Sequence, residues 1–235
     1  VLREIGGPGQ KALKNARVLV VGAGGLGSPV LLYLAAAGVG TIGVIDDDLV
    51  DNSNLQRQVI HRDVDIGLPK VQSAANAMRA QNPRVEVKTY QRRLTADIAG
   101  ALIGEYDLVL DGTDNFATRY LVNAACANAG VPLVAAALTQ WEGQISVYDP
   151  ANGTPCYQCI FPQAPDAALA PSCSEAGVIG PLPGIMGAMM AVEAIKVITG
   201  AGEGLRGRLM IYDALYGETR TITMSPRDDC PVCGH

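Results

Sequence analysis

A glycine-rich loop that joins a buried strand to a helix constrains the fold of this chain more than any other feature. Val18–Val21 (VLVV) predicts a buried strand, and a helix is predicted over 26–37. Between them, Gly22, Gly24 and Gly27 form the pattern G-x-G-x-x-G. Bare glycines let the backbone approach a phosphate, and the N-terminus of the helix adds N–H donors and a positive dipole. The loop therefore predicts a nucleotide-binding site.

An acidic residue at the end of the next strand supports the same interpretation. A strand is predicted over 41–45, and Asp46 follows it directly, about 20 residues beyond the glycines. A carboxylate in that place accepts hydrogen bonds from ribose hydroxyls. The alternative is a glycine-rich turn that packs closely on its sheet, with Asp46 as a solvated strand end.

The order of the predicted elements indicates an α/β fold. Strands are expected at 17–21, 41–45, 85–90, 107–111, 131–136, 143–149, 208–213 and 218–224. Helices are expected at 26–37, 69–81, 95–103, 115–129 and 184–199. The early strands alternate with helices, which predicts a Rossmann-like, mostly parallel sheet. The sixth strand follows the fifth too closely for a helix, so an antiparallel C-terminal extension is expected.

Length and composition limit the possible architectures. The 235 residues contain no linker, repeat or low-complexity tract, which favours a single domain. We expect a nucleotide-binding part at about 1–135 and a second part at about 136–235. Only 17% of residues are charged, which suggests a large buried subunit interface or a large core. The net charge of −5 argues against a nucleic-acid partner.

Two observations argue against a membrane or secreted protein. Residues 18–45 carry no charge, but seven glycines and Pro29 divide this stretch into strand, loop, helix and strand. The N-terminal sequence VLRE has no features of a secretory signal. We therefore expect a cytoplasmic protein that does not enter a membrane.

Four of the six cysteines form two C-x2-C pairs, Cys156/Cys159 and Cys230/Cys233. Paired C-x2-C motifs are typical of a tetrahedral zinc site with four thiolate ligands. Four thiolates leave no open position, so we expect a structural zinc that clamps the C-terminal tail to the loop after the sixth strand. A disulfide framework is the alternative, and the absence of a secretory signal disfavours it. His235 can in principle replace one cysteine.

The remaining two cysteines lie outside these pairs. Cys126 is predicted mid-helix on an alanine-rich face and is interpreted as a packing residue. Cys173 lies in a long irregular loop predicted over 150–183. A loop thiol near a nucleotide site can attack an activated carbonyl or carry sulfur. The alternative for Cys173 is an inert, partly buried thiol.

Polar and cationic residues beyond Asp46 indicate which nucleotide binds. Breaking ATP at the α-phosphate needs charge neutralisation and positioning. Arg57 and Lys70 supply fixed positive charge, and Asn54 and Gln58 can hold phosphate oxygens or the attacking group. A hydride-transfer dinucleotide has no evident use for these cations. The alternatives are a surface salt bridge for Arg57 and the first turn of a solvated helix for Lys70.

A magnesium-binding carboxylate is predicted where strand 107–111 ends. The run DGTDN at 111–115 follows this strand, and ligands of open α/β sheets bind at that edge. Asp114 is placed to hold Mg²⁺, which binds through one or two carboxylates and phosphate oxygens. The alternative for Asp114 is an N-cap of helix 115–129.

With these motifs in place, the chain resembles the ubiquitin-activating-like family, specifically the bacterial adenylyltransferases that act on sulfur carriers of molybdopterin and thiamin biosynthesis. The resemblance covers essentially the whole chain. Its motifs are GAGGLGSP at 22–29, DDDLVDNSNLQRQ at 46–58, GLPK at 67–70, DGTDN at 111–115, CYQC at 156–159, PSCSEAGVIGPL at 171–182 and CPVC at 230–233. The resemblance implies a homodimer that adenylates the C-terminal Gly-Gly carboxylate of a small ubiquitin-like protein and so prepares it for thiocarboxylation.

Site residues are implied by the same resemblance. The family's ATP-contacting positions correspond here to Gly25, Asp46, Ser53, Asn54, Arg57, Lys70, Asp114 and Asn115. Its zinc ligands correspond to the four paired cysteines, and its crossover-loop cysteine corresponds to Cys173. Its N-terminal arginine motif, which reaches the other subunit's triphosphate, would lie just before Val1. No sulfurtransferase-like domain follows Cys233, so a separate protein is expected to donate sulfur.

Two other functional classes explain part of these motifs. An NAD-dependent oxidoreductase accounts for the glycine loop and Asp46, but not for Arg57, Lys70 or the four-cysteine site. A non-catalytic scaffold that binds a ubiquitin-like partner needs neither these cations nor Asp114. The leading hypothesis is therefore an adenylyltransferase with ATP, Mg²⁺ and Zn²⁺. Several thiolation routes share these motifs, which leaves the identity of the carrier open.

Overall fold

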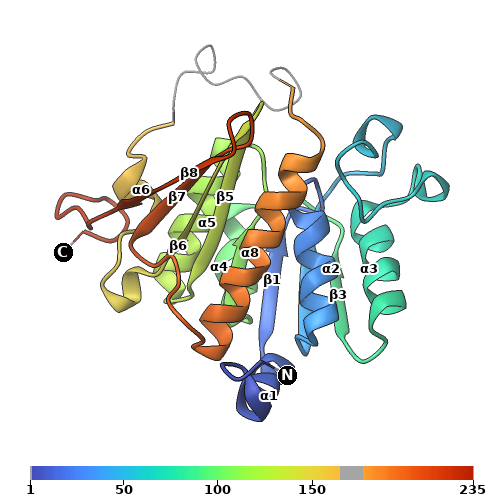
Figure 1. The fold of residues 1–235 in the computed structure, drawn as a ribbon, viewed down its shortest axis with the longest axis horizontal. Helices are drawn as coiled ribbons and strands as arrows, with labels where there is room; N and C mark the ends of the chain where they lie inside the picture. Colours follow the sequence, from blue (N-terminus) through green and yellow to red (C-terminus); the bar gives the residue numbers. More distant parts are fainter. Residues whose placement is uncertain (1, 165–176, 235) are drawn as a thin grey trace.

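The computed structural model describes residues 2–164 and 177–234, which form a sheet covered by helices on both faces (Figure 1). The sheet has eight strands in the order β3-β2-β1-β4-β5-β6-β7-β8. Their bounds are β1 Arg17–Val21, β2 Thr41–Ile45, β3 Glu86–Tyr90, β4 Leu108–Asp111, β5 Leu133–Thr139, β6 Glu142–Tyr148, β7 Arg208–Asp213 and β8 Glu218–Thr223. Each predicted strand is present, and the predicted α/β fold class is confirmed.

The described helices connect the parallel strands as the sequence predicts. The α-helices are α1 Gly6–Asn15, α2 Gly27–Ala37, α3 Lys70–Gln81, α4 Ala96–Ile103, α5 Phe116–Ala129, α6 Tyr157–Ile160 and α8 Pro181–Thr199. The short 3₁₀ helices are η1 Asn52–Asn54, η2 Asp63–Asp65 and η3 Pro150–Asn152. Both α2 and α5 end at a glycine with positive φ, the usual C-terminal stop.

Parallel pairing brings the carboxyl ends of neighbouring strands to one edge of the sheet. β1 pairs with both β2 and β4, and Val21 lies opposite Ile45 and Asp111. The loops that carry the glycines, Asp46 and the DGTDN run therefore start beside one another. Beyond β5 the direction reverses, because β5 and β6 form a tight hairpin and β7 and β8 continue antiparallel. The predicted antiparallel extension is confirmed.

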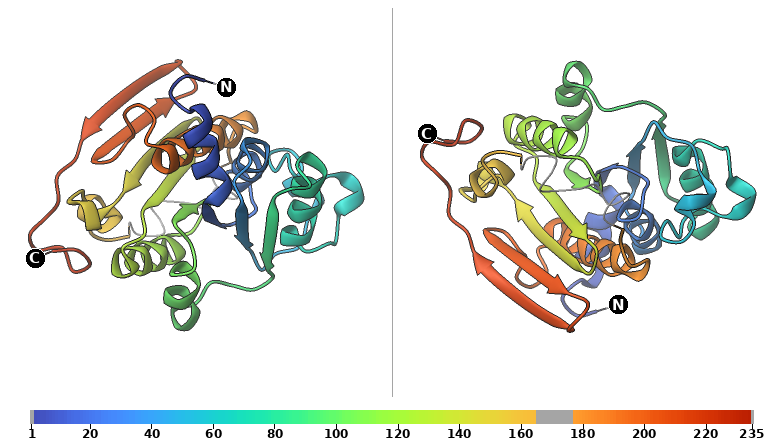
Figure 2. Two further views of the ribbon diagram at one scale, coloured as in Figure 1. Left: turned by 90° about the horizontal axis from the view of Figure 1, so that it is seen from below. Right: turned by 90° about the horizontal axis from the view of Figure 1, so that it is seen from above.

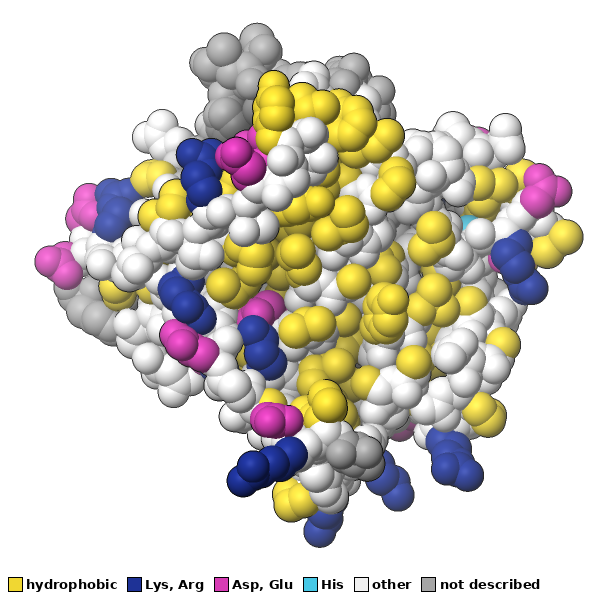
Figure 3. Space-filling model, in the orientation of Figure 1, with side chains coloured by type: hydrophobic (Ala, Val, Ile, Leu, Met, Phe, Trp, Pro, Cys, Tyr) yellow, Lys and Arg dark blue, Asp and Glu magenta, His cyan; other side chains and the backbone are white. Residues whose placement is uncertain are grey.

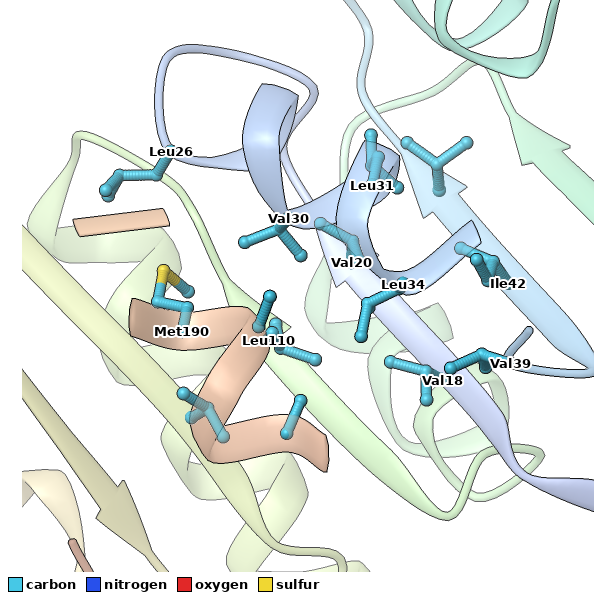
Figure 4. Packing of buried hydrophobic residues seen from close by; sticks show 14 of the residues in the cluster. Val18, Val20, Leu26, Val30, Leu31, Leu34, Val39, Ile42, Leu110 and Met190 are labelled. Carbon is cyan, nitrogen blue, oxygen red and sulfur yellow. The ribbon is translucent and has the colours of Figure 1, made fainter. Parts of the chain in front are cut away.

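Hydrophobic layers cover both faces of the sheet. The helices α1, α2, α3 and α8 pack on one face, and α4 and α5 pack on the other (Figure 2). Figure 4 shows Val30 and Leu34 of α2 and Met190 of α8 packing over the strand residues Val20 and Leu110. These five side chains are fully buried. Truncating such a residue to alanine lowers the free energy of unfolding by about 2–5 kcal/mol. This well-packed core supports the loops at the carboxyl edge of the sheet.

Helix α1 is not predicted by the sequence. Its sequence GGPGQKALKN has three glycines and a proline, which disfavour a helix interior. These residues occupy the first turn, where the missing N–H of Pro8 is tolerated. Leu13 in the last turn is buried in the core, so packing overrides the weak propensity of the segment.

The long loop predicted over 150–183 contains more regular structure than expected. It includes η3 and α6, and α8 begins at Pro181, ahead of the predicted start at 184. Proline is favourable at the start of a helix because its fixed φ suits the first turn. By length and composition α8 is able to cross a membrane, but here it packs against α2, β5 and β6. The uncharged stretch 18–45 forms strand, loop, helix and strand, as predicted.

Candidate active site and metal centre

A cavity of about 1000 Å³ opens at the carboxyl edge of the parallel strands. Loops that follow β1, β2 and β4 line one side of it, and the β5–β6 hairpin with α6 lines the other. The predicted site residues that line it are Gly22, Gly24, Gly25, Asp46, Arg57, Gln58, Lys70, Asp114 and Asn115. The fold therefore brings together most of the site predicted from the sequence. A cavity of this size accommodates a nucleotide.

The glycines of the loop are required for different reasons. Gly22 has a φ of 94°, and a Cβ there would lie 3.2 Å from the Gly112 carbonyl oxygen. A Cβ on Gly27 would lie 2.0 Å from the Gly22 carbonyl oxygen, so Gly27 closes the turn and does not line the cavity. Gly24 and Gly25 do line it, just ahead of α2. Among the described residues, no hydrogen-bond partner is found for their backbone N–H groups.

Asp46 is held by backbone N–H groups. Its Oδ2 accepts a hydrogen bond from Ala23 N at 2.8 Å, and its Oδ1 accepts one from Asp48 N at 2.9 Å. Burial raises the pKa of Asp46, although the two N–H groups and the charge of Lys70 oppose the increase. The carboxylate is thus fixed in the cavity wall, and its remaining lone pairs can accept from ligand hydroxyls.

Lys70 is buried against an acidic partner. It is the first residue of α3, its side chain is only 7% exposed, and Nζ lies 2.7 Å from Asp48 Oδ2. The alternative that places Lys70 in a solvated first turn is therefore wrong. The sequence does not identify Asp48 as its partner, since 22 positions separate the two residues. The only available signal is the acidic run after β2.

Arg57 and Gln58 lie in the same loop. Among the described residues, Arg57 has no ion-pair partner and Gln58 Oε1 has no hydrogen-bond donor. Arg57 donates from Nη1 to the Ser53 carbonyl oxygen at 3.1 Å, and no described carboxylate forms an ion pair with it. Gln58 is 4% exposed, and its Oε1 has no hydrogen-bond partner. A buried acceptor without a donor is unfavourable. A ligand in the cavity that carries N–H or O–H groups would satisfy it.

Ser53 and Asn54 do not line the cavity. Ser53 donates to Asp51 Oδ1 from its N at 2.8 Å and from its Oγ at 2.6 Å. Asn54 Oδ1 accepts from Asp51 N at 3.2 Å, which completes a capping box at η1. Both side chains thus stabilise the loop that carries Arg57, and their contact with ATP stays a prediction.

The loop after β4 contains a buried acid and a buried arginine. Asp111 is 1% exposed and accepts from Thr113 N at 2.9 Å and Oγ1 at 2.6 Å. Burial raises the pKa of Asp111, while the nearby charge of Arg119 opposes the increase. Arg119 also donates to the Thr113 carbonyl oxygen at 2.7 Å and lines the cavity. Arg119 is not predicted from the sequence, because helix periodicity alone does not distinguish a buried arginine from a solvated one.

Asn115, and not Asp114, caps the following helix. Its Oδ1 accepts from Thr118 N at 2.9 Å at the start of α5. The capping alternative for Asp114 is therefore wrong. Asp114 is exposed, lines the cavity and makes no hydrogen bond or ion pair with a described residue. Its oxygens are free to bind a cation.

A second group of carboxylates lies nearby but is already engaged. Oxygens of Asp46, Asp47 and Asp48 lie within 4.8 Å of one another. Asp46 accepts two backbone N–H groups, and Asp48 pairs with Lys70. Asp114 is the better candidate for a cation ligand because these interactions do not compete there.

The two C-x2-C pairs meet beside α6, where Figure 1 shows the C-terminal tail. The sulfur–sulfur distances are 3.9 Å for Cys156–Cys159, 3.6 Å for Cys156–Cys230 and 3.4 Å for Cys159–Cys233. None of the four forms a disulfide. A tetrahedron with metal–sulfur bonds of about 2.3 Å has edges of about 3.8 Å. The predicted four-cysteine cluster is confirmed, and its geometry fits a single metal ion.

Neighbouring groups support the cluster. Asn123 of α5 donates from Nδ2 to Cys156 Sγ at 3.6 Å, and its Oδ1 accepts from Tyr157 N at 2.8 Å. Burial raises the pKa of the Cys230 thiol, but the N–H groups of Cys233 and Val232 outweigh burial and lower it to about 7. A thiol with that pKa readily supplies the thiolate that a metal requires.

The sequence also assigns roles to Cys126, Cys173 and His235, and the structure describes only the first of them. Cys126 is 2% exposed within α5, and burial raises the pKa of its thiol, in agreement with the predicted packing role. Cys173 and His235 lie outside the described residues. The roles predicted for both stay predictions.

Comparison with known protein families matches residues 1–232 to the ThiF family. The chain belongs to the ThiF family. The match spans the glycine loop, the cavity and three of the four clustered cysteines, and it ends one residue before Cys233. The family predicted from the sequence motifs is thereby confirmed.

Relatives of this ThiF-family chain share about half of its residues. A sulfur carrier protein adenylyltransferase of Thermus thermophilus is 49% identical over 238 residues, which cover 100% of this chain and 88% of the relative. The probable adenylyltransferase/sulfurtransferase MoeZ of Mycobacterium tuberculosis is 52% identical over 234 residues, which cover 98% of this chain and 60% of MoeZ. The SAMP-activating enzyme E1 of Haloferax volcanii is 46% identical over 234 residues, which cover 100% of this chain and 86% of that relative.

Solved structures share the fold. The crystal structure of E. coli MccB with ATP has a TM-score of 0.85 and 26% identity, and the match covers 97% of this chain and 69% of that one. A structure of MccB with AMPCPP and MccA gives the same TM-score, 0.85, and the same identity, 26%. The sheet order and its antiparallel extension are therefore a fold also found in an enzyme solved with ATP.

Proposed function

We propose that this chain uses ATP to adenylate the C-terminal Gly-Gly carboxylate of a small ubiquitin-like sulfur-carrier protein. The observation that carries the proposal is the convergence, in one cavity, of the glycine loop, Asp46 and the cations Arg57 and Lys70. The relatives named as sulfur-carrier adenylyltransferases support the same activity. An NAD-dependent oxidoreductase and a non-catalytic scaffold gain no support from either source.

In the proposed reaction, a carboxylate oxygen of the carrier attacks the α-phosphorus of ATP. A phosphorus–oxygen bond to the carrier forms, and the bond between the α-phosphorus and the bridging oxygen of the β-phosphate breaks. Pyrophosphate leaves with that electron pair. Negative charge grows on pyrophosphate as it leaves, so fixed cations stabilise the transition state more than the ground state. Arg57 and Lys70 are the cations in the cavity wall that we assign to this role.

Each wall of the cavity suits one part of the nucleotide. Gly24 and Gly25 present N–H groups to phosphate oxygens at the start of α2. Asp46 accepts hydrogen bonds from the ribose, and Gln58 offers the acceptor that has no internal donor. Asp114 would hold Mg²⁺, which neutralises phosphate charge when bound. The assignments of Ser53, Asn54 and Asn115 rest on the family resemblance.

The opposite wall of the cavity suits the carrier. Residues Thr139, Glu142 and Gln144 of the β5–β6 hairpin line it, together with Tyr157 and Phe161 at α6. A Gly-Gly tail has no side chains, so it can lie extended along such a wall. We therefore assign nucleotide binding to about 1–135 and partner binding to about 136–235, within one domain. A separate protein would donate sulfur, with Cys173 as the candidate thiol for its transfer.

We assign the four-cysteine cluster to structural zinc. Four thiolates match the preference of Zn²⁺ for a closed tetrahedral site, and they leave no position for a reacting ligand. The site would hold the C-terminal tail against α6 and α5 through Asn123.

We also assign a homodimer to this chain. Figure 3 shows hydrophobic side chains gathered over the face that carries α2 and α8. On these two helices, Tyr33 of α2 is 56% exposed and Val192 of α8 is 54% exposed. A contiguous apolar surface of this kind is typical of subunit interfaces. Light scattering after size exclusion would give a dimer mass, and Val192→Asp should shift it toward the monomer.

Pyrophosphate exchange tests the proposed activity. Labelled pyrophosphate should enter ATP only when Mg²⁺ and a carrier that ends in Gly-Gly are both present. A carrier truncated by its last glycine is the matched control and should not support exchange. Exchange that does not depend on the carrier, or fluorescence quenching by NAD in place of exchange, would contradict the proposal.

A further inference from the structure

His61 is a buried histidine that the proposed chemistry does not use. It is 5% exposed and lies outside the cavity lining, next to the glycine loop. Its Nε2 lies 2.9 Å from the Ala23 carbonyl oxygen, and its Nδ1 lies 2.8 Å from Ser73 Oγ. Ser73 Oγ in turn lies 3.0 Å from Asp65 Oδ2. The chain of contacts joins the glycine loop to η2 and α3.

The chemistry of these groups fixes where the ring proton lies. A carbonyl oxygen only accepts hydrogen bonds, so the contact with Ala23 requires a proton on Nε2 of His61. Nδ1 then accepts from Ser73 when the ring is neutral, and donates to it when the ring is charged. The bond to Ala23 therefore exists in both protonation states, which makes it a constant feature of the loop.

The backbone N–H and the backbone C=O of Ala23 each form a hydrogen bond with a side chain from a different part of the chain. Its N–H donates to Asp46 after β2, and its C=O accepts from His61. A trans peptide is planar, so the N–H of Gly24 points opposite to the carbonyl oxygen of Ala23. Fixing that oxygen toward His61 fixes the Gly24 N–H on the other side of the loop. Gly24 lines the cavity, and its N–H has no partner among the described residues.

We propose that His61 is a positioning residue that, through a proton on Nε2, orients the Ala23–Gly24 peptide so that the loop N–H groups face the nucleotide phosphates. This inference rests on the proposed nucleotide site, but not on the identity of the carrier. His61 touches no ligand in this arrangement. It acts through the backbone, by the bond from Nε2 to the Ala23 carbonyl oxygen.

The charges around the ring explain its protonation. Burial lowers the pKa of His61, and the positive charge of Lys70 on α3 adds to the decrease. The Ala23 carbonyl and the carboxylates of Asp46 and Asp65 raise the pKa, but their combined effect is smaller than the decrease. The ring is consequently neutral near pH 7, and the bond to Ala23 places its single proton on Nε2.

A matched set of variants tests the proposal. The amide nitrogen of glutamine reaches about as far as Nε2, whereas asparagine reaches only about as far as Nδ1. Calorimetric titration with ATP should give an affinity about 10-fold weaker for His61→Asn, the effect of losing one hydrogen bond. His61→Gln should stay within about 3-fold of wild type, as should Ser73→Ala, which leaves the bond to Ala23 intact. Equal affinities for wild type and His61→Asn, or equal losses for Asn and Gln, would overturn the proposal.

A second measurement needs neither ATP nor turnover. In ring ¹⁵N spectra, the signals of His61 are those that disappear in His61→Gln. They should show the Nε2–H tautomer. The chain has only two histidines, which makes the assignment simple. An Nδ1–H tautomer would refute the proposal even if a variant folds poorly. A protein that binds ATP but shows no carrier-dependent exchange would instead refute the proposed activity and leave the role of His61 intact.

Discussion

The parallel and antiparallel halves of the sheet are stabilised in different ways. The strand β1 is buried at every position but its first, and β4 is buried throughout, because helices cover both of their faces. In β8 every residue is exposed, and its one neighbour is β7. The tail beyond β8 is held by the cysteine cluster. The parallel half thus depends on hydrophobic packing, and the end of the antiparallel half depends on the four-cysteine cluster, for which we propose a structural zinc.

Removing a cluster ligand should have the largest effect and should separate the two halves. Structural zinc contributes on the order of 10 kcal/mol to the folding of the segments it joins. We expect Cys230→Ser to lose its metal and to increase amide hydrogen exchange in β7, β8 and the tail. ATP affinity should stay near wild type, because the nucleotide wall belongs to the parallel half. Elemental analysis should find one zinc per wild-type chain.

Cys126→Ala is the matched control for this experiment. It removes a buried thiol that lies outside the cluster, so it should keep the metal. A wild-type protein without metal, together with disulfides among the four cysteines, would contradict the assignment of zinc.

The next largest effect concerns the two cations of the parallel half. Arg57→Ala and Lys70→Met should each lower pyrophosphate exchange by about 100-fold or more, the scale of losing one electrostatic stabiliser. Thermal stability should fall only for Lys70→Met, because Lys70 is buried with Asp48 and Arg57 forms no ion pair with a described residue. Arg84→Ala, an exposed arginine outside the cavity, is the control. Unchanged exchange in both cation variants would refute their role.

A smaller effect is expected at Asp114. Asp114→Asn removes a charge but leaves the cap of α5 intact, since Asn115 supplies it. Exchange at limiting Mg²⁺ should fall by about 10-fold and recover as Mg²⁺ is raised, with an unchanged melting temperature. Glu105→Gln, an exposed carboxylate outside the cavity, should change neither quantity. Loss of stability with normal exchange would show that Asp114 is structural.

The smallest effect is a pH dependence of stability within the parallel half. The pKa of His61 is lowered from 6.5 by burial, so between its two pKa values the unfolded chain binds a proton that the native chain does not. The free energy of unfolding should therefore decrease as pH falls through about 6.5 and be fully retained above it. In His61→Gln this part of the dependence should vanish. Denaturant unfolding from about pH 7.5 to about 5.5 would measure it, and identical slopes in both proteins would contradict it.

The parallel half was also the easier half to predict from the sequence. Its strands are short apolar runs between glycines and helices, and the positions of Gly22, Gly24 and Asp46 indicated the site directly. The C-x2-C spacing predicted the cluster equally well, because ligand spacing is local. By contrast, α1 was missed because Leu13 stabilises it through tertiary packing.

Other contacts in the structure could not be predicted from the sequence. The burial of Lys70 depends on Asp48, and the orientation of Ala23 depends on His61, 38 positions away. Neither pairing leaves a pattern in the local sequence. Ser53 Oγ donates to Asp51 Oδ1, and Asn54 Oδ1 accepts from Asp51 N in a capping box, while the contact of both residues with ATP stays a prediction. Residue type indicates which bonds are available, and only the fold decides which of them form.

The spacing of the four cysteines would determine when the chain acquires the zinc that we propose for it. Cys156 and Cys230 are 74 positions apart, and the segment between them includes α8, β7 and β8. A ribosome releases the nucleotide half first, so β1 to β5 can pair while the second C-x2-C motif has yet to be made. Closing a loop of this length costs about 4 to 5 kcal/mol of chain entropy, which the metal–sulfur bonds of the proposed site would have to offset in one step. Capture of the proposed zinc would therefore come late in the biogenesis of this protein, and a cell short of zinc would accumulate chains that hold ATP but have a loose tail.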